Sequence, residues 1–192
     1  ERMVKESKNP DFVLDEIPLD DKETFEMLAA GDASGVFQFE SSGMRQVLAQ
    51  LKPTGIEDLI AVNSLYRPGP MDFIPTYIRN RHHPEEVRYK TPMLEPILGV
   101  TNGVIVYQEQ VMQICRQLAG FSYGQADLVR RAMSKKKADV MEKERAHFID
   151  GNTTPGHECC GCVANGIPRE VASAIFDDMS SFASYAFNKS HA

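Results

Sequence analysis

The residues best suited to chemistry form a basic stretch at positions 127–137. Its last eight positions hold five arginines and lysines and no carboxylate, although the 192-residue chain has a formal net charge of -6. Residues four apart are neighbours on a helix surface, so a helix here would place Arg131 beside Lys135 and Arg130 beside Ser134. Arginine forks suit pairs of phosphate oxygens, and lysines act as point charges beside them. The stretch therefore predicts an edge that binds anions, with a solvated charged face as the alternative.

Helix signals around this stretch predict how it is held. Ser122 with Gln125 forms a capping box that would open the helix. Ala126, Val129 and Met133 recur at the spacing of a face turned toward a core. The basic edge is therefore expected to have a buried apolar face behind it.

In the rest of the chain, helix-capping residues, apolar residues at helical spacing and helix-breaking residues follow one another. Asp20 with Glu23 predicts another capped helix start, and residues 35–40 could form a short strand or an extended link. Residues 104–107 could start a strand, but the favoured interpretation is that they run into a helix. This helix has Val111, Ile114 and Leu118 on one face, and Gly120 closes it. Further helices are predicted after Ser41 or Ser42, after Thr54, over residues 72–83, after Asp139 and after Pro168.

These patterns predict a mainly α fold, an irregular multi-helix domain with short extended or β segments. We expect one domain over residues 1–192, with residues 1–19 as an irregular lead-in and residues 152–162 as an inserted loop. A hydrophobic fraction of 42% and a charged fraction of 25% are ordinary for a globular domain.

The ends of the sequence and its cysteines indicate the setting in which the protein works. The chain opens on Glu1 and stops at Ala192, which suggests a piece excised from a longer protein. No signal peptide or run of the roughly 20 apolar residues that cross a bilayer is visible, so no membrane partner is expected. Three of the four cysteines crowd into residues 159–162, which is not a disulfide framework and favours a reducing, cytoplasmic setting.

Five stretches occur in the same order as in a family of replication proteins. They are residues 36–44, 65–71, 103–112, 126–137 and 182–192. Together they resemble the alpha subunit of bacterial DNA polymerase III, from about Ile17 to the end of the chain. The resemblance implies a fingers domain, which binds the incoming dNTP and the template-primer DNA for DNA-directed DNA synthesis.

The resemblance also implies what this chain lacks. Polymerases of the family join nucleotides by two-metal phosphoryl transfer, with Mg2+ held by aspartates of the palm. No Asp-x-Asp pair on a strand pattern is present here, so the isolated chain is expected to be inactive and to hold no catalytic residue. Expected partners are DNA, dNTP, the palm and other domains of the same polymerase, and replisome subunits such as the sliding clamp through other regions.

The residue types and the resemblance together predict two groups of binding side chains. Those expected to bind nucleotide are Arg130, Arg131, Lys135, Tyr107, Gln108, Asn188, Lys189, Ser190 and His191. Those expected to touch DNA are Arg67, Arg79, Arg81, Lys136 and Lys137. Ser134 stands where the family commonly has glycine.

Each of the less basic candidates has a structural alternative. Tyr107, Gln108 and Gln110 could be a buried hydrogen-bonded set. Asn188 could be a plain N-cap, and Arg67 could tie the Pro-Gly-Pro turn after it to a neighbouring carbonyl.

The cysteine-rich segment permits a zinc hypothesis. His157, Cys159, Cys160 and Cys162 are suitable ligand types, but a second Cys-x-x-Cys pair at the usual spacing is missing. A surface loop with free thiols is the favoured interpretation. For the whole chain, the alternative function is a helical protein- or DNA-interaction module without a nucleotide pocket.

Overall fold

A computed structural model of the chain describes residues 1–135, 138–183 and 187–191. The described residues are mainly α-helical, with two isolated bridges in place of a sheet, which confirms the predicted fold class. Contacts group the chain into two compact units, Glu1–Leu59 and Ile60–Ala192, and the division falls within helix α4 (Ile56–Leu65). The single-domain organisation stays a prediction.

The first unit contains short helices joined by turns. They are α1 (Arg2–Ser7), the 3-10 turn η1 (Leu14–Glu16), α2 (Lys22–Ala29) and α3 (Ser42–Leu51). Helix α2 packs on α3 and buries Phe25 and Leu28. The Ser41 hydroxyl accepts a hydrogen bond from the Met44 amide at 3.3 Å, which confirms the predicted cap of α3.

Three details predicted for this unit are wrong. Asp21, not Asp20, caps α2, because its carboxylate lies three residues before the Thr24 amide and accepts a hydrogen bond from it at 2.9 Å. The lead-in is not wholly irregular, since Arg2–Ser7 closes helical hydrogen bonds. Residues 35–40 form turns rather than a strand, with Gln38 at a φ of 68° that breaks an extended path.

The second unit contains most of the helical mass. Its helices after α4 are α5 (Ile74–His82), α6 (Glu95–Leu98), α7 (Gln108–Ala119), α8 (Tyr123–Ser134), α9 (Ala138–Asp150) and α10 (Arg169–Ala183). Its 3-10 turns are η2 (Pro70–Phe73), η3 (Pro84–Glu86), η4 (Pro92–Leu94), η5 (Gly99–Thr101) and η6 (Lys189–His191). No helix within the described ranges is long and apolar enough to span a bilayer.

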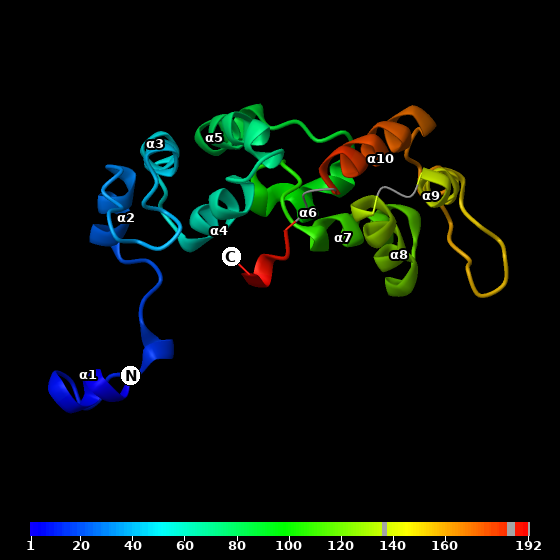
Figure 1. The fold of residues 1–192 in the computed structure, drawn as a ribbon. Coiled ribbons are helices and arrows are strands. Elements are labelled where there is room, and N and C mark those ends of the chain that lie inside the picture. Colours follow the sequence, from blue (N-terminus) through cyan, green and yellow to red (C-terminus); the bar gives the residue numbers. More distant parts are fainter. Residues whose placement is uncertain (136–137, 184–186, 192) are drawn as a thin grey trace. The chain divides into compact units, whose positions relative to one another are not determined.

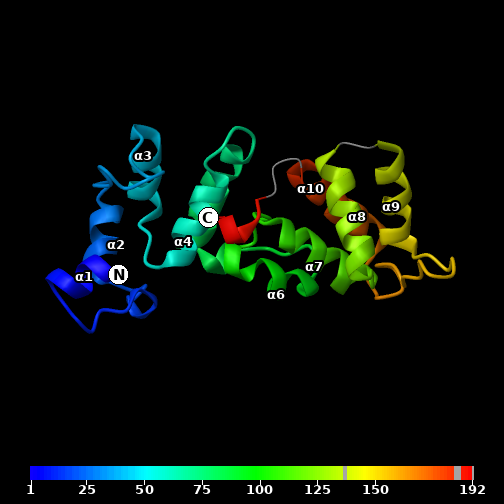
Figure 2. The same ribbon diagram turned by 60° about the horizontal axis from the view of Figure 1, so that its bottom comes forward.

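The core of this unit lies among α7, α8, α9 and α10. Helix α8 packs against all three of the others, as Figure 1 and Figure 2 show. Ile114, Val129, Phe148 and Phe176 are among the fully or almost fully buried side chains of one continuous apolar cluster. The aromatic rings of Phe148 and Phe176 lie 5.5 Å apart between centroids. Helix α8 is therefore fixed on one side, which leaves its other side to carry charge.

Gln110 fixes the start of α7, which faces the basic helix. Its side-chain oxygen accepts hydrogen bonds from the amides of Val106 and Tyr107 at 2.8 and 2.9 Å. Its amide nitrogen donates to the Thr101 hydroxyl at 2.7 Å and to the Ile97 carbonyl at 3.2 Å. The structural alternative for Gln110 is therefore the observed one: this residue is only 3% exposed and joins a buried hydrogen-bonded set.

We expect Gln110→Leu to lower the free energy of unfolding by about 2 kcal/mol, because two buried amides lose their acceptor. Chemical denaturation of the 192-residue chain would measure the change. Gln113→Leu, on the exposed side of the same helix, is the matched control and should cost little. An equal loss in the two variants would contradict the role given to Gln110.

Candidate functional site

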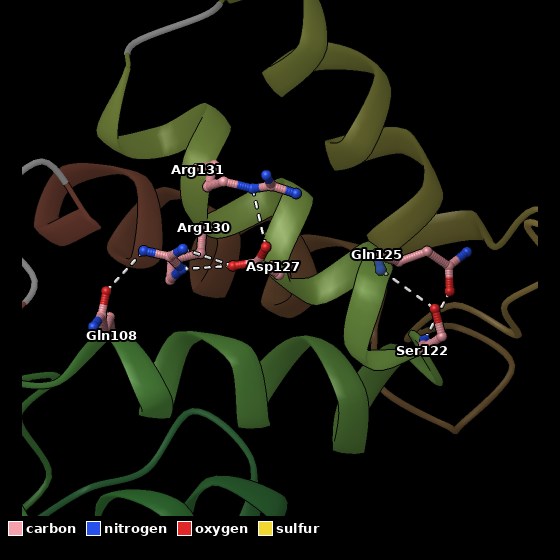
Figure 3. A network of polar contacts seen from close by, with 6 residues as sticks. All are labelled: Gln108, Ser122, Gln125, Asp127, Arg130 and Arg131. Carbon is pink, nitrogen blue, oxygen red and sulfur yellow. Dashed lines mark hydrogen bonds and ion pairs between the residues drawn. The ribbon is translucent and has the colours of Figure 1, made fainter. Parts of the chain in front are cut away.

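Helix α8 begins as its sequence predicts. The Ser122 amide donates to the Gln125 side chain at 2.7 Å, and the Gln125 amide donates to the Ser122 hydroxyl at 3.3 Å. Figure 3 shows this capping box at the start of the helix. Ala126, Val129 and Met133 are buried, so the predicted inner face is confirmed.

The outer face of α8 carries two arginines that share one carboxylate. Oδ1 of Asp127 accepts hydrogen bonds from Nε and Nη2 of Arg130 at 2.9 and 2.6 Å. Oδ2 of Asp127 lies 3.0 Å from Nε of Arg131. Hydrogen bonds from Arg130, followed by the positive charges of both arginines, hold the pKa of Asp127 below its usual value. The carboxylate is therefore ionised at neutral pH and bridges the two guanidinium groups.

The two arginines face different surroundings. Nη1 of Arg130 donates to the side-chain oxygen of Gln108 at 2.8 Å, which links α8 to the first residue of α7. Arg131 lies on the far side of Asp127 from α7 (Figure 3). The side chain of Arg130 is 26% exposed and that of Arg131 is 59% exposed. Arg131 is therefore the more accessible of the two.

Arg131 and Lys135 line the same open hollow, as their spacing predicts. The hollow has a volume of about 290 Å³ and lies between α8 and α9, with Leu128, Ala132 and Val140 as its apolar wall. The predicted DNA contacts Lys136 and Lys137 lie outside the described residues.

The C-terminal segment returns to the start of α7. A parallel bridge joins Phe187 to Tyr107, with the Gln108 amide donating to the Phe187 carbonyl at 2.9 Å. Nζ of Lys189 lies 5.6 Å from the centroid of the Tyr107 ring. The Lys189 amide donates to the Glu109 carboxylate at 3.4 Å, which places a negative charge beside this lysine.

Asn188 caps a single turn. Its side-chain oxygen accepts a hydrogen bond from the Ser190 amide at 2.9 Å, and η6 occupies only Lys189–His191 of the described chain. The aligned peptide dipoles that would attract an anion need a longer helix. The described residues of this segment therefore do not form the helix N-terminus that would attract a phosphate. Nucleotide contact stays a prediction for Asn188, Ser190 and His191.

The arginines predicted to contact DNA lie in two different parts of the second unit. Cζ of Arg67 lies 4.5 Å from the centroid of the Phe187 ring, so Arg67 contacts the C-terminal segment that also carries Lys189. Its Nε donates to the Ser64 carbonyl at 3.0 Å, which matches the structural alternative for this residue. Arg79 and Arg81 lie in the last turn of α5, on a different helix.

The thiols of Cys159 and Cys160, which follow His157 in the chain, face different backbone carbonyls. Sγ of Cys160 donates to the Ala119 carbonyl at 3.3 Å, whereas Sγ of Cys159 is directed at the His147 carbonyl at 3.6 Å. Cys162 is fully buried, and burial raises its pKa to about 12. The prediction of a surface loop is therefore wrong for Cys162. Its backbone amide donates a hydrogen bond to the Phe148 carbonyl, and this places the side chain in the core. Zinc binding would require these side chains to rearrange, and it stays the less favoured alternative.

Two residues of this site escaped the sequence-based assignment. Asp127 could have been found, because a carboxylate three and four residues before two arginines is placed to pair with both. Phe187 could not have been found from spacing, since it meets Tyr107 across 80 residues of chain.

The fold and the site together define a helical domain that presents a carboxylate-bridged arginine pair beside an open, cationic hollow. The sequence matches the family described as the bacterial DNA polymerase III alpha subunit finger domain over residues 1–156, and the chain belongs to this family. It is 51% identical over 189 residues to the DNA polymerase III subunit alpha of Staphylococcus epidermidis. It is 50% identical over the same length to the subunit of that name from Staphylococcus aureus. These matches cover 98% of this chain and 17% of each relative, so the chain spans about a sixth of their length.

Proposed function

We propose that this chain is the part of a DNA-directed DNA polymerase that binds the triphosphate of the incoming dNTP. Arg131, Lys135 and Arg130 are the proposed phosphate contacts. The observation that carries the proposal is the exposed Arg131 fork beside Lys135 at an open hollow, in a chain of the finger-domain family. Membership of this family favours a finger domain over a helical interaction module.

The chemistry follows from the ligand and from these cations. Phosphoryl transfer builds negative charge on the leaving pyrophosphate, and fixed cations stabilise that charge as it develops. Terminal nitrogens of Arg131 can bind two phosphate oxygens at once, and Lys135 adds charge without a fixed direction. Gln108 and Tyr107 would border the nucleotide through their contacts with Arg130 and Lys189.

Three aspartates that the sequence places in adjacent pairs already have partners in the fold. The Asp177 carboxylate is engaged by Arg145, with Nη1 at 2.5 Å from Oδ1, and Asp178 pairs with Lys90. Asp21 caps a helix. We propose that the palm of the full-length protein holds the Mg2+ ions of such a reaction and that this chain contributes none of their ligands.

The proposed DNA contacts form a second group. Arg67, Arg79 and Arg81, together with Lys136 and Lys137, would neutralise phosphates of the template-primer. Such contacts make affinity fall as salt rises, because each neutralised phosphate releases a bound counterion. The palm, the neighbouring domains and other replisome subunits are the proposed protein partners.

The proposal can be tested with the full-length polypeptide that carries this chain. A primed template and dNTPs should give primer extension that requires Mg2+. A dNTP with a photoreactive group on its γ-phosphate should label α8, with unmodified dNTP as the competitor. Extension with labelling confined to other segments would contradict the site, and a failure to extend would contradict the proposed activity.

A further inference from the structure

The Asp127 carboxylate is a shared acceptor in the middle of the basic helix. It receives two hydrogen bonds from Arg130 and lies in contact with Nε of Arg131. The three residues occupy positions three and four apart, so one helical turn holds them together. A bare arginine pair would repel itself, and the carboxylate between the two guanidinium groups offsets this repulsion.

The two arginines are engaged to different extents by the contacts of the described residues. Arg130 uses Nε and Nη2 on Asp127 and Nη1 on Gln108. Within the described part of the chain, Arg131 uses Nε alone, so both of its terminal nitrogens stay available. The available edge of Arg131 has the geometry that binds two phosphate oxygens. Arg130 is instead braced between two helices.

We propose that Asp127 is a positioning residue that holds the Arg131 fork in the orientation that receives phosphate. Gln108 braces Arg130, Arg130 fixes Asp127, and Asp127 fixes Arg131. This inference rests on the proposed function, because it assigns how one of the phosphate contacts is oriented.

The Asp127 carboxylate has two opposite effects on dNTP affinity: it orients Arg131, and its negative charge repels the triphosphate. A flexible arginine loses side-chain entropy when it binds, and prior fixing by Asp127 reduces that loss. The carboxylate also repels a triphosphate, but water screens this effect because the Asp127 side chain is 33% exposed. We therefore expect orientation to be the larger effect, so that removing the carboxylate weakens dNTP binding rather than strengthening it.

The test measures dNTP affinity by single-turnover incorporation in the full-length polypeptide. Asp127→Asn keeps the size of the side chain and should raise the dNTP Kd about tenfold, the scale of one charged hydrogen bond. Asp127→Glu should recover most of the affinity, since it keeps a carboxylate four residues before Arg131. Glu142→Gln removes one charge from the exposed surface of α9 and is the matched control, for which an unchanged Kd is expected.

A second comparison separates positioning from a general structural role. In an Arg131→Ala background, Asp127→Asn should add little, because the side chain that it orients is already absent. Tighter binding by Asp127→Asn alone, or a full additional loss in the Arg131→Ala background, would overturn the inference. If Arg131→Ala itself leaves the Kd unchanged, the proposed phosphate site fails. If only Asp127→Asn has no effect, the positioning role alone fails.

Discussion

Replacing Arg131 with alanine in the full-length polypeptide is expected to lower the efficiency of dNTP incorporation by about 100-fold, the scale of losing one preorganised donor. The side chain is 59% exposed and its observed partner is Asp127, so little of the fold depends on it. Alanine is also the best helix former, which keeps α8 intact. The loss should therefore appear in catalysis and leave stability almost unchanged.

Rapid-quench incorporation on a primed template would measure this effect. Arg131→Lys should recover only part of the efficiency, because a lysine keeps the charge and loses the bidentate fork. Lys143→Ala removes an exposed cation of α9 and should leave incorporation unchanged. An Arg131→Ala enzyme with wild-type efficiency would remove this residue from the site.

Arg130 should behave differently from Arg131. Its replacement by alanine frees Asp127 and breaks the link to Gln108, so incorporation and the free energy of unfolding should both fall. This contrast follows from the 26% exposure of Arg130 and its contacts to two helices. Equal behaviour of the two variants in both measurements would contradict the division of roles.

The second large effect concerns stability at Gly161. A Cβ at this position would lie 2.3 Å from the backbone nitrogen of Gly151, where the end of α9 meets the cysteine-rich loop. The backbone φ of 78° adds strain for any side chain. We expect Gly161→Ala to lower the free energy of unfolding by about 4 kcal/mol, from left-handed strain and a clash that backbone atoms cannot relieve.

Gly166 supplies the control for this prediction. Its φ is 80°, and a Cβ there would meet nothing within 4 Å. Gly166→Ala should therefore cost about 1 kcal/mol, which is the strain alone. Urea unfolding of the two variants would measure the difference, and equal losses would show that the approach of Gly151 and Gly161 does not matter for stability.

Local signals predicted the helices well. Ser41, Ser122 with Gln125, and Gly120 mark helix ends that the structure confirms, because caps are decided by a few neighbouring backbone groups. The neighbouring residues Asp20 and Asp21 show the limit of this reasoning. Either aspartate could cap α2, and only the backbone geometry selects the second.

Contacts between distant segments could not be predicted in this way. The bridge from Phe187 to Tyr107 brings Lys189 beside α7, and no spacing in the sequence encodes that pairing. The burial of Cys162 depends on the α9 backbone, which its amide meets at Phe148. In contrast, the inner face of α8 was predictable, because the spacing of its apolar residues lies within one short segment of the sequence.

We propose above all that Arg131 binds the triphosphate of a dNTP. The most direct test is a structure of the full-length polypeptide with primed DNA and a non-hydrolysable dNTP. We expect terminal nitrogens of Arg131 within hydrogen-bonding distance of phosphate oxygens, with Nε still held by Asp127. A triphosphate bound elsewhere, with the Arg131 fork turned to solvent, would contradict the claim.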